Sequence, residues 1–452
     1  MPNLSALTNL RLPLGGRRGA DVVGLDIQPG YVAAVQAHVN GGIVVERAAG
    51  APLPPDTVRE GEVFDERGLG EALQELFQDA GLGKRVRVGL ANQRTVLRTL
   101  DLPPVTDRKE LAAAVRFQAE DQVPMPLASA VLDFHSLGVF DTPAGPRQRV
   151  IVVAAQREMV ERLLRAVRYA GLRAEGVDLS AFALIRSLYR PGPAPAAAHG
   201  ADGEGANGPV QQERVLYLNV GGLTNMAIAE GTLCRFTRVV GGGLEAMASE
   251  IAERGGIPLV EARALLAAFE LNKPAPAVLP EPAPSAPEPP AIDADGSEVG
   301  QLEREPSGDP DEGSPPQEAE RVETWALAQG AAAPPAQEPA ERPETAPPSS
   351  TAVHRLEAEV RLVLENGIRE IVGEVRNSLD FHRSQEGGGE VQSVVLSGPA
   401  LELRGFSEAL EADLGIAVRR EAVHFAGGQN LNGISAHRLA IATGLATEEA
   451  PR

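Results

Sequence analysis

The sequence predicts an α/β fold made of two related lobes, and three observations lead to this prediction. A strand, a glycine turn and a second strand occur at residues 24–35 and again at residues 216–228. Around these hairpins, apolar runs of strand length alternate with amphipathic helical segments, a pattern typical of α/β layers. With 452 residues, the chain is long enough for two or more domains with sizeable cores. We therefore expect a duplicated architecture whose halves face each other across a cleft.

Each hairpin places a polar side chain near the end of a strand and bare backbone N–H groups in the turn. Glycine allows the backbone to come close to a phosphate and to adopt positive φ. The residues that form this pattern are Asp26 and Gly30 in the first hairpin, and Asn219, Gly221, Gly222 and Thr224 in the second. We expect both turns to face the same cleft.

The other elements follow from apolar periodicity and from helix-capping signals. Asp107, with Glu110 three residues later, is a capping-box signal that begins a helix, and Pro124 and Pro126 end it. Periodicity predicts further helices at 160–171, 352–384 and 436–446, and strands at 86–90, 95–100, 149–155 and 393–396.

Two more loops contribute candidate site residues. Gly242 and Gly243 precede a helix, whose N-terminus suits an anion. Ser397 and Gly398 follow the last strong strand. Loops at the carboxyl ends of strands converge on one crevice, where a carboxylate such as Asp26 would hold Mg²⁺ through water while turn amides cradle phosphates. Simple turns and helix caps would explain the same residues, and the sequence leaves both explanations open.

The composition excludes several classes of protein. The net charge of −20 argues against a general affinity for nucleic acid or anionic lipid. The single cysteine, Cys234, rules out an internal disulfide and a thiolate metal site, and fits a reduced, cytoplasmic setting. No apolar run approaches the roughly 18 residues that span a bilayer.

Residues 274–350 differ sharply in composition from the rest. They hold 18 of the 37 prolines and sixteen Asp and Glu against three Arg, a net charge of −13. With so few large apolar residues, this segment cannot offset the entropy of ordering, and we expect it to be disordered. The expected organisation is a disordered tail at 1–20, a first lobe at 21–190, a linker at 191–212, the first part of a second lobe at 213–273, the acidic Pro-rich insertion at 274–350, the rest of the second lobe at 351–446, and a tail at 447–452.

Longer motifs occur in a fixed order along the chain. They are Leu-Pro at 102–103, AEDQVPMPL at 119–127, DLSAFAL at 178–184, EVRNSLDFH at 374–382 and GLA at 444–446. Together with the hairpins and Leu396-Ser397-Gly398, they resemble the actin/Hsp70/FtsA superfamily and, within it, the type IV pilus assembly protein PilM family. By this resemblance, the hairpins correspond to the phosphate-1 and phosphate-2 loops, and Leu396-Ser397-Gly398 to the adenosine loop.

The resemblance implies a fold, a cofactor and partners. The fold would be actin-like (ribonuclease H-like) and two-lobed, with an inserted SHS2-type α+β subdomain at about 90–177, and the cofactor would be ATP with Mg²⁺. The implied partners are the cytoplasmic N-terminal peptide of a PilN-like inner-membrane protein and the pilus motor ATPases, with no nucleic acid and with the membrane reached only through partners. The peptide would lie in a groove lined from about 88–135, where Leu111 and Val115 supply apolar pockets. This places the chain in the cytoplasm, at the inner face of the cell membrane.

The chain departs from the family pattern in its nucleotide loops. Gln28 replaces a glycine, Ala33 a phosphate-contacting lysine, Asn219 the second acid, and Pro399 a glycine with its N–H donor. Losing a lysine contact and a carboxylate weakens phosphate binding and slows turnover. The departures predict degenerate nucleotide-binding loops, with nucleotide affinity weak or lost, and a scaffold that links motor components to inner-membrane assembly proteins.

Two alternatives remain from this sequence. One is an active actin-like ATPase in pilus biogenesis, which needs the intact Mg²⁺ anchor that Asn219 does not provide. The other is an FtsA-like filament-forming cell-division protein, which is expected to have a C-terminal amphipathic membrane helix. Residues 446–452 are too short and too acidic for that helix.

Overall fold

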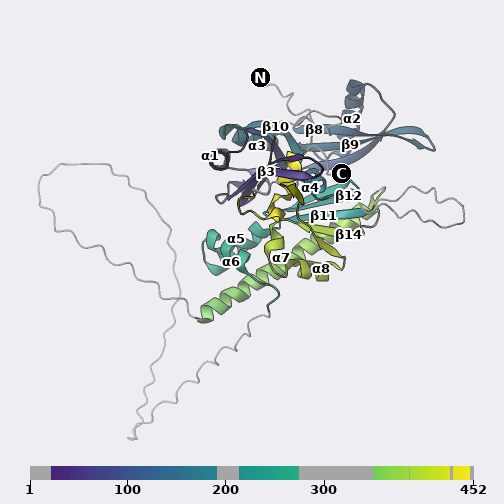
Figure 1. Cartoon of the computed structure of the whole chain (residues 1–452). Coiled ribbons are helices and arrows are strands. Elements are labelled where there is room, and N and C mark those ends of the chain that lie inside the picture. The colour runs from purple at the N-terminus through teal and green to yellow at the C-terminus, as the bar shows by residue number, and fades with distance from the viewer. Residues whose placement is uncertain (1–21, 191–212, 274–349, 386, 428–430, 448–452) are drawn as a thin grey trace, which may run out of the picture. The chain divides into compact units, whose positions relative to one another are not determined.

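The computed structural model describes residues 22–190, 213–273, 350–385, 387–427 and 431–447 (Figure 1). The predicted tail at 1–20, the linker at 191–212, nearly all of the acidic insertion at 274–350 and the final tail after Thr447 lie outside the described residues. Within the described part, the predicted helices and strands form with ends shifted by a few residues. The segment predicted as one helix at 436–446 is a 3₁₀ turn followed by an α-helix.

The first lobe is built on a six-stranded sheet. Its strands are β1 (Val23–Gln28), β2 (Tyr31–Val39), β3 (Ile43–Pro52), β6 (Arg85–Leu90), β10 (Arg173–Leu179) and β16 (Phe425–Gly427). The strand order is β10-β6-β1-β2-β3-β16. Strands β1, β2 and β3 form an antiparallel meander, and β6 and β10 add in parallel on the β1 side.

The second lobe repeats this connectivity in a five-stranded sheet. Its strands are β11 (Arg214–Val220), β12 (Thr224–Glu230), β13 (Leu233–Val240), β14 (Ser393–Ser397) and β15 (Val418–Arg420). The order is β13-β12-β11-β14-β15. Again three antiparallel strands form a meander, and two parallel strands add beside the first. The two hairpins that the sequence showed, β1–β2 and β11–β12, therefore hold equivalent places in two sheets of the same topology.

Helices cover one face of each sheet with apolar side chains. In the first lobe these are α1 (Glu66–Asp79) and α3 (Arg157–Tyr169), beside a short ribbon of β4 (Val58–Arg59) and β5 (Glu62–Val63). In the second lobe they are α5 (Leu244–Gly255), α6 (Leu259–Ala268), α7 (Ser350–Ser384) and α8 (Phe406–Leu414). Each lobe thus has its own buried core.

A third core joins the two sheets. It is formed by α4 (Ser180–Leu188) and α9 (Ala440–Ala446), with the 3₁₀ turn η3 (Ala436–Leu439) leading into α9 and a second turn, η2 (Pro399–Glu402), after β14. Two glycines allow close approach: a Cβ on Gly24 would overlap the Ala442 carbonyl oxygen, and one on Gly444 would overlap the Ala183 carbonyl oxygen. Because both obstacles are backbone atoms, α9 packs directly against β1 and α4.

A small α+β subdomain is inserted between β6 and α3. It consists of β7 (Val96–Leu102), α2 (Arg108–Gln122), β8 (Ala130–Thr142) and β9 (Gly145–Gln156), with strand order β7-β9-β8. The Asp107 side chain caps α2 by accepting the N–H groups of Lys109 and Glu110, each at 2.9 Å. This sheet ends at Gln156, earlier than the predicted limit of about 177, because β10 pairs with β6 in the first-lobe sheet.

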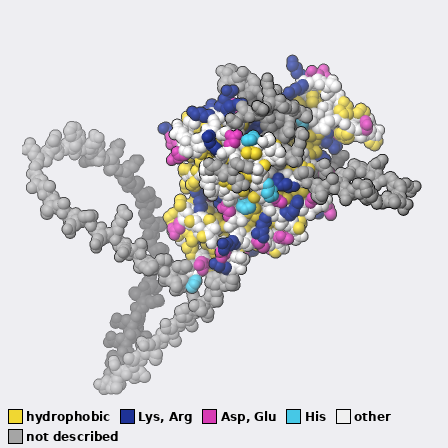
Figure 2. Space-filling view, in the orientation of Figure 1, with side chains coloured by type: hydrophobic (Ala, Val, Ile, Leu, Met, Phe, Trp, Pro, Cys, Tyr) yellow, Lys and Arg dark blue, Asp and Glu magenta, His cyan; other side chains and the backbone are white. Residues whose placement is uncertain are grey.

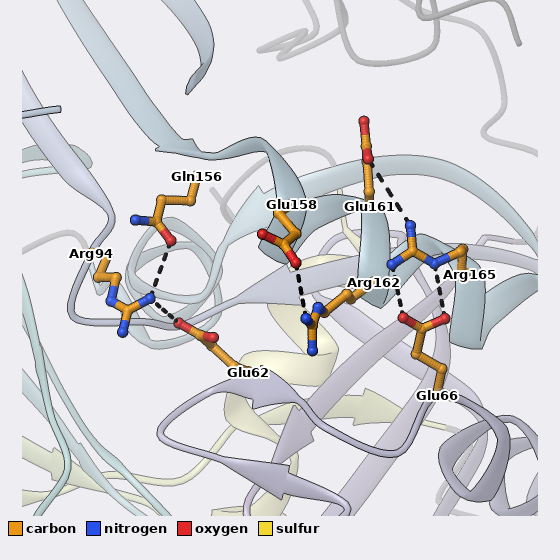
Figure 3. A network of polar contacts seen from close by, with 8 residues as sticks. All are labelled: Glu62, Glu66, Arg94, Gln156, Glu158, Glu161, Arg162 and Arg165. Carbon is orange, nitrogen blue, oxygen red and sulfur yellow. Dashed lines mark hydrogen bonds and ion pairs between the residues drawn. The ribbon is translucent and has the colours of Figure 1, made fainter. Parts of the chain in front are cut away.

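Polar contacts lie where the insert meets the first lobe and on the neighbouring helix α3 (Figure 3). Near the start of the insert, Arg94 Nη1 donates to Gln156 Oε1 at 3.2 Å and lies 3.0 Å from Glu62 Oε1. On α3, Arg165 makes a bidentate pair with Glu66 of α1, with both bonds at 2.8 Å. Arg94 thus joins the two ends of the insert to each other and to Glu62 of the first lobe, while the Arg165 pair holds α3 against α1.

Candidate functional site

A cavity of about 180 Å³ lies between the two hairpin turns. One wall is the β1–β2 turn and the other is the β11–β12 turn, so the loops that the sequence predicted to converge lie together. Helices α5 and α6 and the η2 and η3 turns complete the lining. The lining residues are Asp26, Gln28, Pro29, Gly30, Tyr31, Pro52, Gly221, Gly222, Leu244, Glu245, Arg263, Leu266, Ala267, Pro399, Glu402, Leu403 and Arg438.

Four of the ten predicted site residues line this cavity: Asp26, Gly30, Gly221 and Gly222. The other six lie behind the lining. The Thr224 hydroxyl donates to the Gly242 carbonyl, and Gly243 lies against the carbonyl oxygens of Gly221 and Gly222. Asn219 and Ser397 are buried register partners on β11 and β14, and Gly398 lies beside Asn219 Nδ2. These six residues support the turns and do not line the cavity.

The Gln28 side chain spans the cavity wall and joins the two hairpins. Its Nε2 donates to Asp26 Oδ2 at 2.7 Å, and its Oε1 accepts the Gly222 N–H at 3.0 Å. Only this orientation of the Gln28 amide satisfies both contacts. In the reversed orientation, Oε1 would face the Asp26 carboxylate and Nε2 would face the Gly222 N–H. The residue is buried, with 8 % exposure. Gln28 therefore takes up an amide of the turn that the sequence predicted to cradle phosphate.

The neighbouring backbone amides are also bonded within the protein. The Gly221 N–H donates to the Leu223 carbonyl at 2.9 Å, and the Leu244 N–H donates to the Gly221 carbonyl at 2.7 Å. Backbone N–H groups bind an anion only when they point into the site without another partner. The three bonds at Gly221, Gly222 and Leu244 leave these amides no donor for a phosphate oxygen.

Asp26 is a carboxyl held almost out of water. It is 4 % exposed, and burial raises its pKa to about 7. The hydrogen bond from Gln28 lowers the pKa, but its effect is smaller than that of burial. Asn219, at the equivalent strand position of the second lobe, is 3 % exposed, and its Oδ1 has no hydrogen-bond partner in the part of the chain described. The two polar side chains are thus one titrating acid and one neutral amide.

Two ion pairs fill the rest of the lining. Glu245 pairs with Arg263, and its carboxylate lies so close to Gly30 that a Cβ there would overlap it. Arg263 Nη1 also reaches the Leu53 carbonyl across the cleft at 3.4 Å. In the second pair, Arg438 binds Glu402 at 2.7 Å. The sequence analysis did not select these four charged residues, since each is an ordinary helix or turn residue until the fold brings it to the cavity.

A second, mainly apolar cavity of about 80 Å³ lies between the insert and the two lobes. It is lined by Asp133, Phe134, His135 and Leu137 of β8, Ile151 and Val153 of β9, Phe182 and Arg186 of α4, and Thr232, Leu233 and Cys234 at the β12–β13 turn. Leu111 and Val115 do not line it. Both are buried on Leu100, Leu102, Val150 and Val152 inside the insert, so the prediction that they supply groove pockets is wrong.

No metal-binding cluster of three His, Cys, Asp or Glu side chains occurs among the described residues. No described helix is long and apolar enough to cross a bilayer. Cys234 is buried, and burial raises the pKa of its thiol to about 12, so it is a core residue in its neutral form.

Comparison with known proteins identifies related chains. Residues 24–193 match the family model of the type IV pilus assembly protein PilM. A solved "PilM-PilN type IV pilus biogenesis complex" aligns with 20 % identity and a TM-score of 0.59, over 95 % of this chain and 98 % of that chain. Two further structures align with lower scores. They are the ethanolamine utilization protein EutJ from Carboxydothermus hydrogenoformans, at 14 % identity and a TM-score of 0.42 over 98 % and 93 % of the chains, and MreB5 of Spiroplasma citri bound to ADP, at 10 % and 0.43 over 95 % of each.

Proposed function

We propose that this chain is a type IV pilus assembly protein that works as a scaffold. Residues 24–193 match the PilM family model, and the fold is actin-like, as the motifs predicted. In this proposal the chain links pilus motor ATPases to a PilN-like inner-membrane protein without turning over nucleotide. It reaches the inner face of the cell membrane through that partner.

The bridge made by Gln28 carries the scaffold part of the proposal. ATP with Mg²⁺ needs open turn amides for the phosphates and an ionised acid to orient metal-bound water. Here Gln28 occupies the Gly222 amide and one oxygen of Asp26. Asn219 is neutral, and the Glu245 carboxylate, ion-paired with Arg263, lies against Gly30 in the space beside the first turn. The residues present do not fit a Mg²⁺–nucleotide complex, so the proposed scaffold does not use one.

The apolar cavity beside α4 supports the partner assignment. An extended peptide gains specificity from side chains that enter apolar pockets and affinity from main-chain bonds. Leu137, Ile151, Val153, Phe182 and Leu233 offer such a pocket, with Arg186 at its polar side. Since the Arg186 guanidinium is already held by Asp178 and by the Gly444 carbonyl, it is a fixed wall of the pocket. We assign this cavity to an apolar side chain of the PilN-like peptide.

A binding measurement tests the proposal directly. Fluorescence anisotropy with the labelled N-terminal peptide of the PilN-like protein should show binding to the full chain, with the same affinity with and without ATP and Mg²⁺. Leu137→Glu or Leu233→Glu should weaken binding at least tenfold, since each places a charge in the apolar pocket. Val139→Glu is the matched control, because Val139 lies on the same strand but is 59 % exposed and outside the lining.

Two results would contradict the proposal. Equal binding by the Leu137 and Val139 variants would show that the peptide does not bind in this cavity. Steady ATP hydrolysis by the wild-type chain, lost on Asp26→Ala, would show an enzyme in place of a scaffold. Circular dichroism at rising temperature separates lost binding from lost folding in each variant.

A further inference from the structure

A third groove lies between α2 and the free edge of the inserted sheet, and it shares only Asp133 and Phe134 of its lining with the apolar cavity described above. Its volume is about 480 Å³, larger than either of the others. It is lined by Arg108, Ala112, Ala113 and Arg116 of α2, by Leu127, by residues 130–134 of β8, and by Arg157 at the start of α3. In this region of the surface, hydrophobic side chains lie among charged ones of both signs (Figure 2).

The groove exists because one helix covers only part of a three-stranded sheet. Helix α2 packs Leu111 and Val115 on side chains of β7 and β9. Strand β8 is at the edge of the sheet and is only partly covered, so Leu132 and Phe134 remain half-buried as an apolar floor. An edge strand beside an apolar floor is a template for adding another strand.

The backbone of β8 offers pairing groups to this groove. The Phe134 N–H donates to the Asp133 carboxylate at 2.8 Å, and Arg157 Nη2 donates to the Ala130 carbonyl at 2.7 Å. These groups are therefore turned away from β9. Because the direction alternates along an antiparallel strand, the N–H and C=O of Leu132, midway between them, face the same edge.

The charges at the groove favour an acidic occupant. Arg108 and Arg116 are exposed, and neither has an ion pair or hydrogen bond with any other described residue. Eight residues of helix place them about 12 Å apart on one face. In an extended peptide, side chains four residues apart on one face are separated by about 13 Å. Asp133 is the acidic side chain in the lining, and Glu120 lies one turn beyond Arg116, outside it.

The whole chain carries a net charge of −20, of which −13 lies in residues 274–350. Because the chain is acidic as a whole, we expect attraction for a negative segment to come from these guanidiniums at short range. Next to Arg116, Phe117 is 75 % exposed and stands on the same stripe of α2 as Ala113. Phe117 itself lies outside the lining of the groove.

We propose that this groove docks an extended acidic segment of a partner protein, which pairs with β8 at Leu132 and places two carboxylates four residues apart on Arg108 and Arg116. The groove shares no lining residue with the cavity between the hairpins, and it shares Asp133 and Phe134 with the apolar cavity assigned to the PilN-like peptide. Arg108 and Arg116 line the groove alone, so the proposed charge recognition does not rest on either of those assignments.

The test uses a synthetic probe and the full chain. The probe is a fluorescein-labelled peptide, Glu-Val-Ser-Val-Glu-Val-Ser, compared with the same peptide carrying Lys for both Glu and with one N-methylated at its central valine. Arg108→Glu and Arg116→Glu should each weaken binding of the acidic probe about tenfold, and the double variant more. Lys109→Glu is the matched control, since this residue is exposed on the same helix but does not line the groove. The Lys and N-methyl probes should bind at least tenfold more weakly.

Each other outcome overturns the proposal. Equal affinity for the Glu and Lys probes would show that the guanidiniums do not select charge. Equal loss in the Lys109 variant would point to the overall charge of α2. If light scattering showed a dimer that dissociates when Arg116 is changed, the groove would be occupied by a second copy of this chain. Binding to phosphatidylserine vesicles that competes with the probe would make it a lipid surface. Unchanged binding of the PilN-like peptide by the Arg108 and Arg116 variants keeps the two grooves distinct.

Discussion

At the scale of single residues, Gln28 decides what the cleft between the two hairpins can bind. Its side chain accepts from Gly222 at 3.0 Å and donates to Asp26 at 2.7 Å, so one neutral amide satisfies a donor and an acceptor that a nucleotide complex would otherwise use. A buried amide with both ends bonded is stable where it is, because removing it leaves buried partners unsatisfied.

Replacing Gln28 should therefore open the site. Gln28→Gly frees the Gly222 amide and Asp26, and we expect nucleotide to bind measurably tighter than to the wild type in a calorimetric titration with Mg²⁺. Gln28→Glu is the informative control, because a carboxylate could accept from Gly222 but would repel both Asp26 and phosphate. No gain in affinity for Gln28→Gly would mean that Glu245 and Asn219 alone are enough to exclude the nucleotide.

Asp26 should make stability depend on pH. Burial raises its pKa from 3.8 to about 7, so between these pH values the folded state holds a proton that the unfolded state has lost. Stability then falls as pH rises from about 4 to 7, by up to about 1.4 kcal/mol per pH unit, and levels off above pH 7. Denaturant unfolding of the wild type and of Asp26→Asn should be measured from pH 5 to 8. The free energy of unfolding of the wild type should fall relative to that of the variant up to about pH 7 and then stay constant relative to it. Parallel curves would show that Asp26 titrates at its ordinary pKa.

At the scale of elements, α2 is the clearest case of local sequence fixing a helix. Asp107 caps its first turn, Leu111 and Val115 bury its apolar side, and the chain turns at Val123 before Pro124. Its remaining side is exposed, which is what leaves the groove beside β8. The same helix thus serves as the cover of the insert and as one wall of a surface groove.

Removing the cap should weaken α2 by a predictable amount. Asp107→Ala leaves two N–H groups without a side-chain partner and should lower the free energy of unfolding by about 1 kcal/mol. Asp107→Asn, which keeps a side-chain oxygen for those groups, should cost much less. Urea unfolding and amide exchange in residues 108–111 measure both. An equal loss in the two variants would indicate that the charge of Asp107, and not its cap, matters.

At the scale of the whole molecule, two sheets of the same topology are joined through α4 and α9. Leu184, Ile185, Ile441 and Leu445 are buried in the core between the sheets, and Gly444 lets the backbones of the two helices meet. Gln28–Gly222 and Arg263–Leu53 add polar contacts across the cleft. The lobes are therefore connected by a packed apolar core, and the cleft lies at its edge.

Two glycine substitutions compare this junction with an ordinary helix. Gly444→Ala sets a Cβ against the Ala183 backbone and should destabilise the protein by about 1–3 kcal/mol or more, because neither helix can move without disturbing the core. Gly373→Ala, in α7 with open space around the new Cβ, should stabilise it by up to about 1 kcal/mol. Thermal unfolding of the full chain reports both. A neutral Gly444→Ala would mean that α9 is not held against α4.

The duplicated α/β architecture was predictable from the sequence alone, because strand and helix periods and glycine turns are local properties of the chain. It also predicted the similarity to the PilM family model, which matches residues 24–193 and so includes the motif at 119–127. Which residues meet in the cavities depends on the tertiary structure. Gln28 is a departure from a pattern in the sequence, but its contact with Gly222 spans 194 positions. Glu245, Arg263 and Arg438 reach the cavity through packing between distant segments, and Leu111 and Val115 face inward because a sheet lies beneath them. Long-range contacts of this kind have no local signature, because they depend on how whole elements pack.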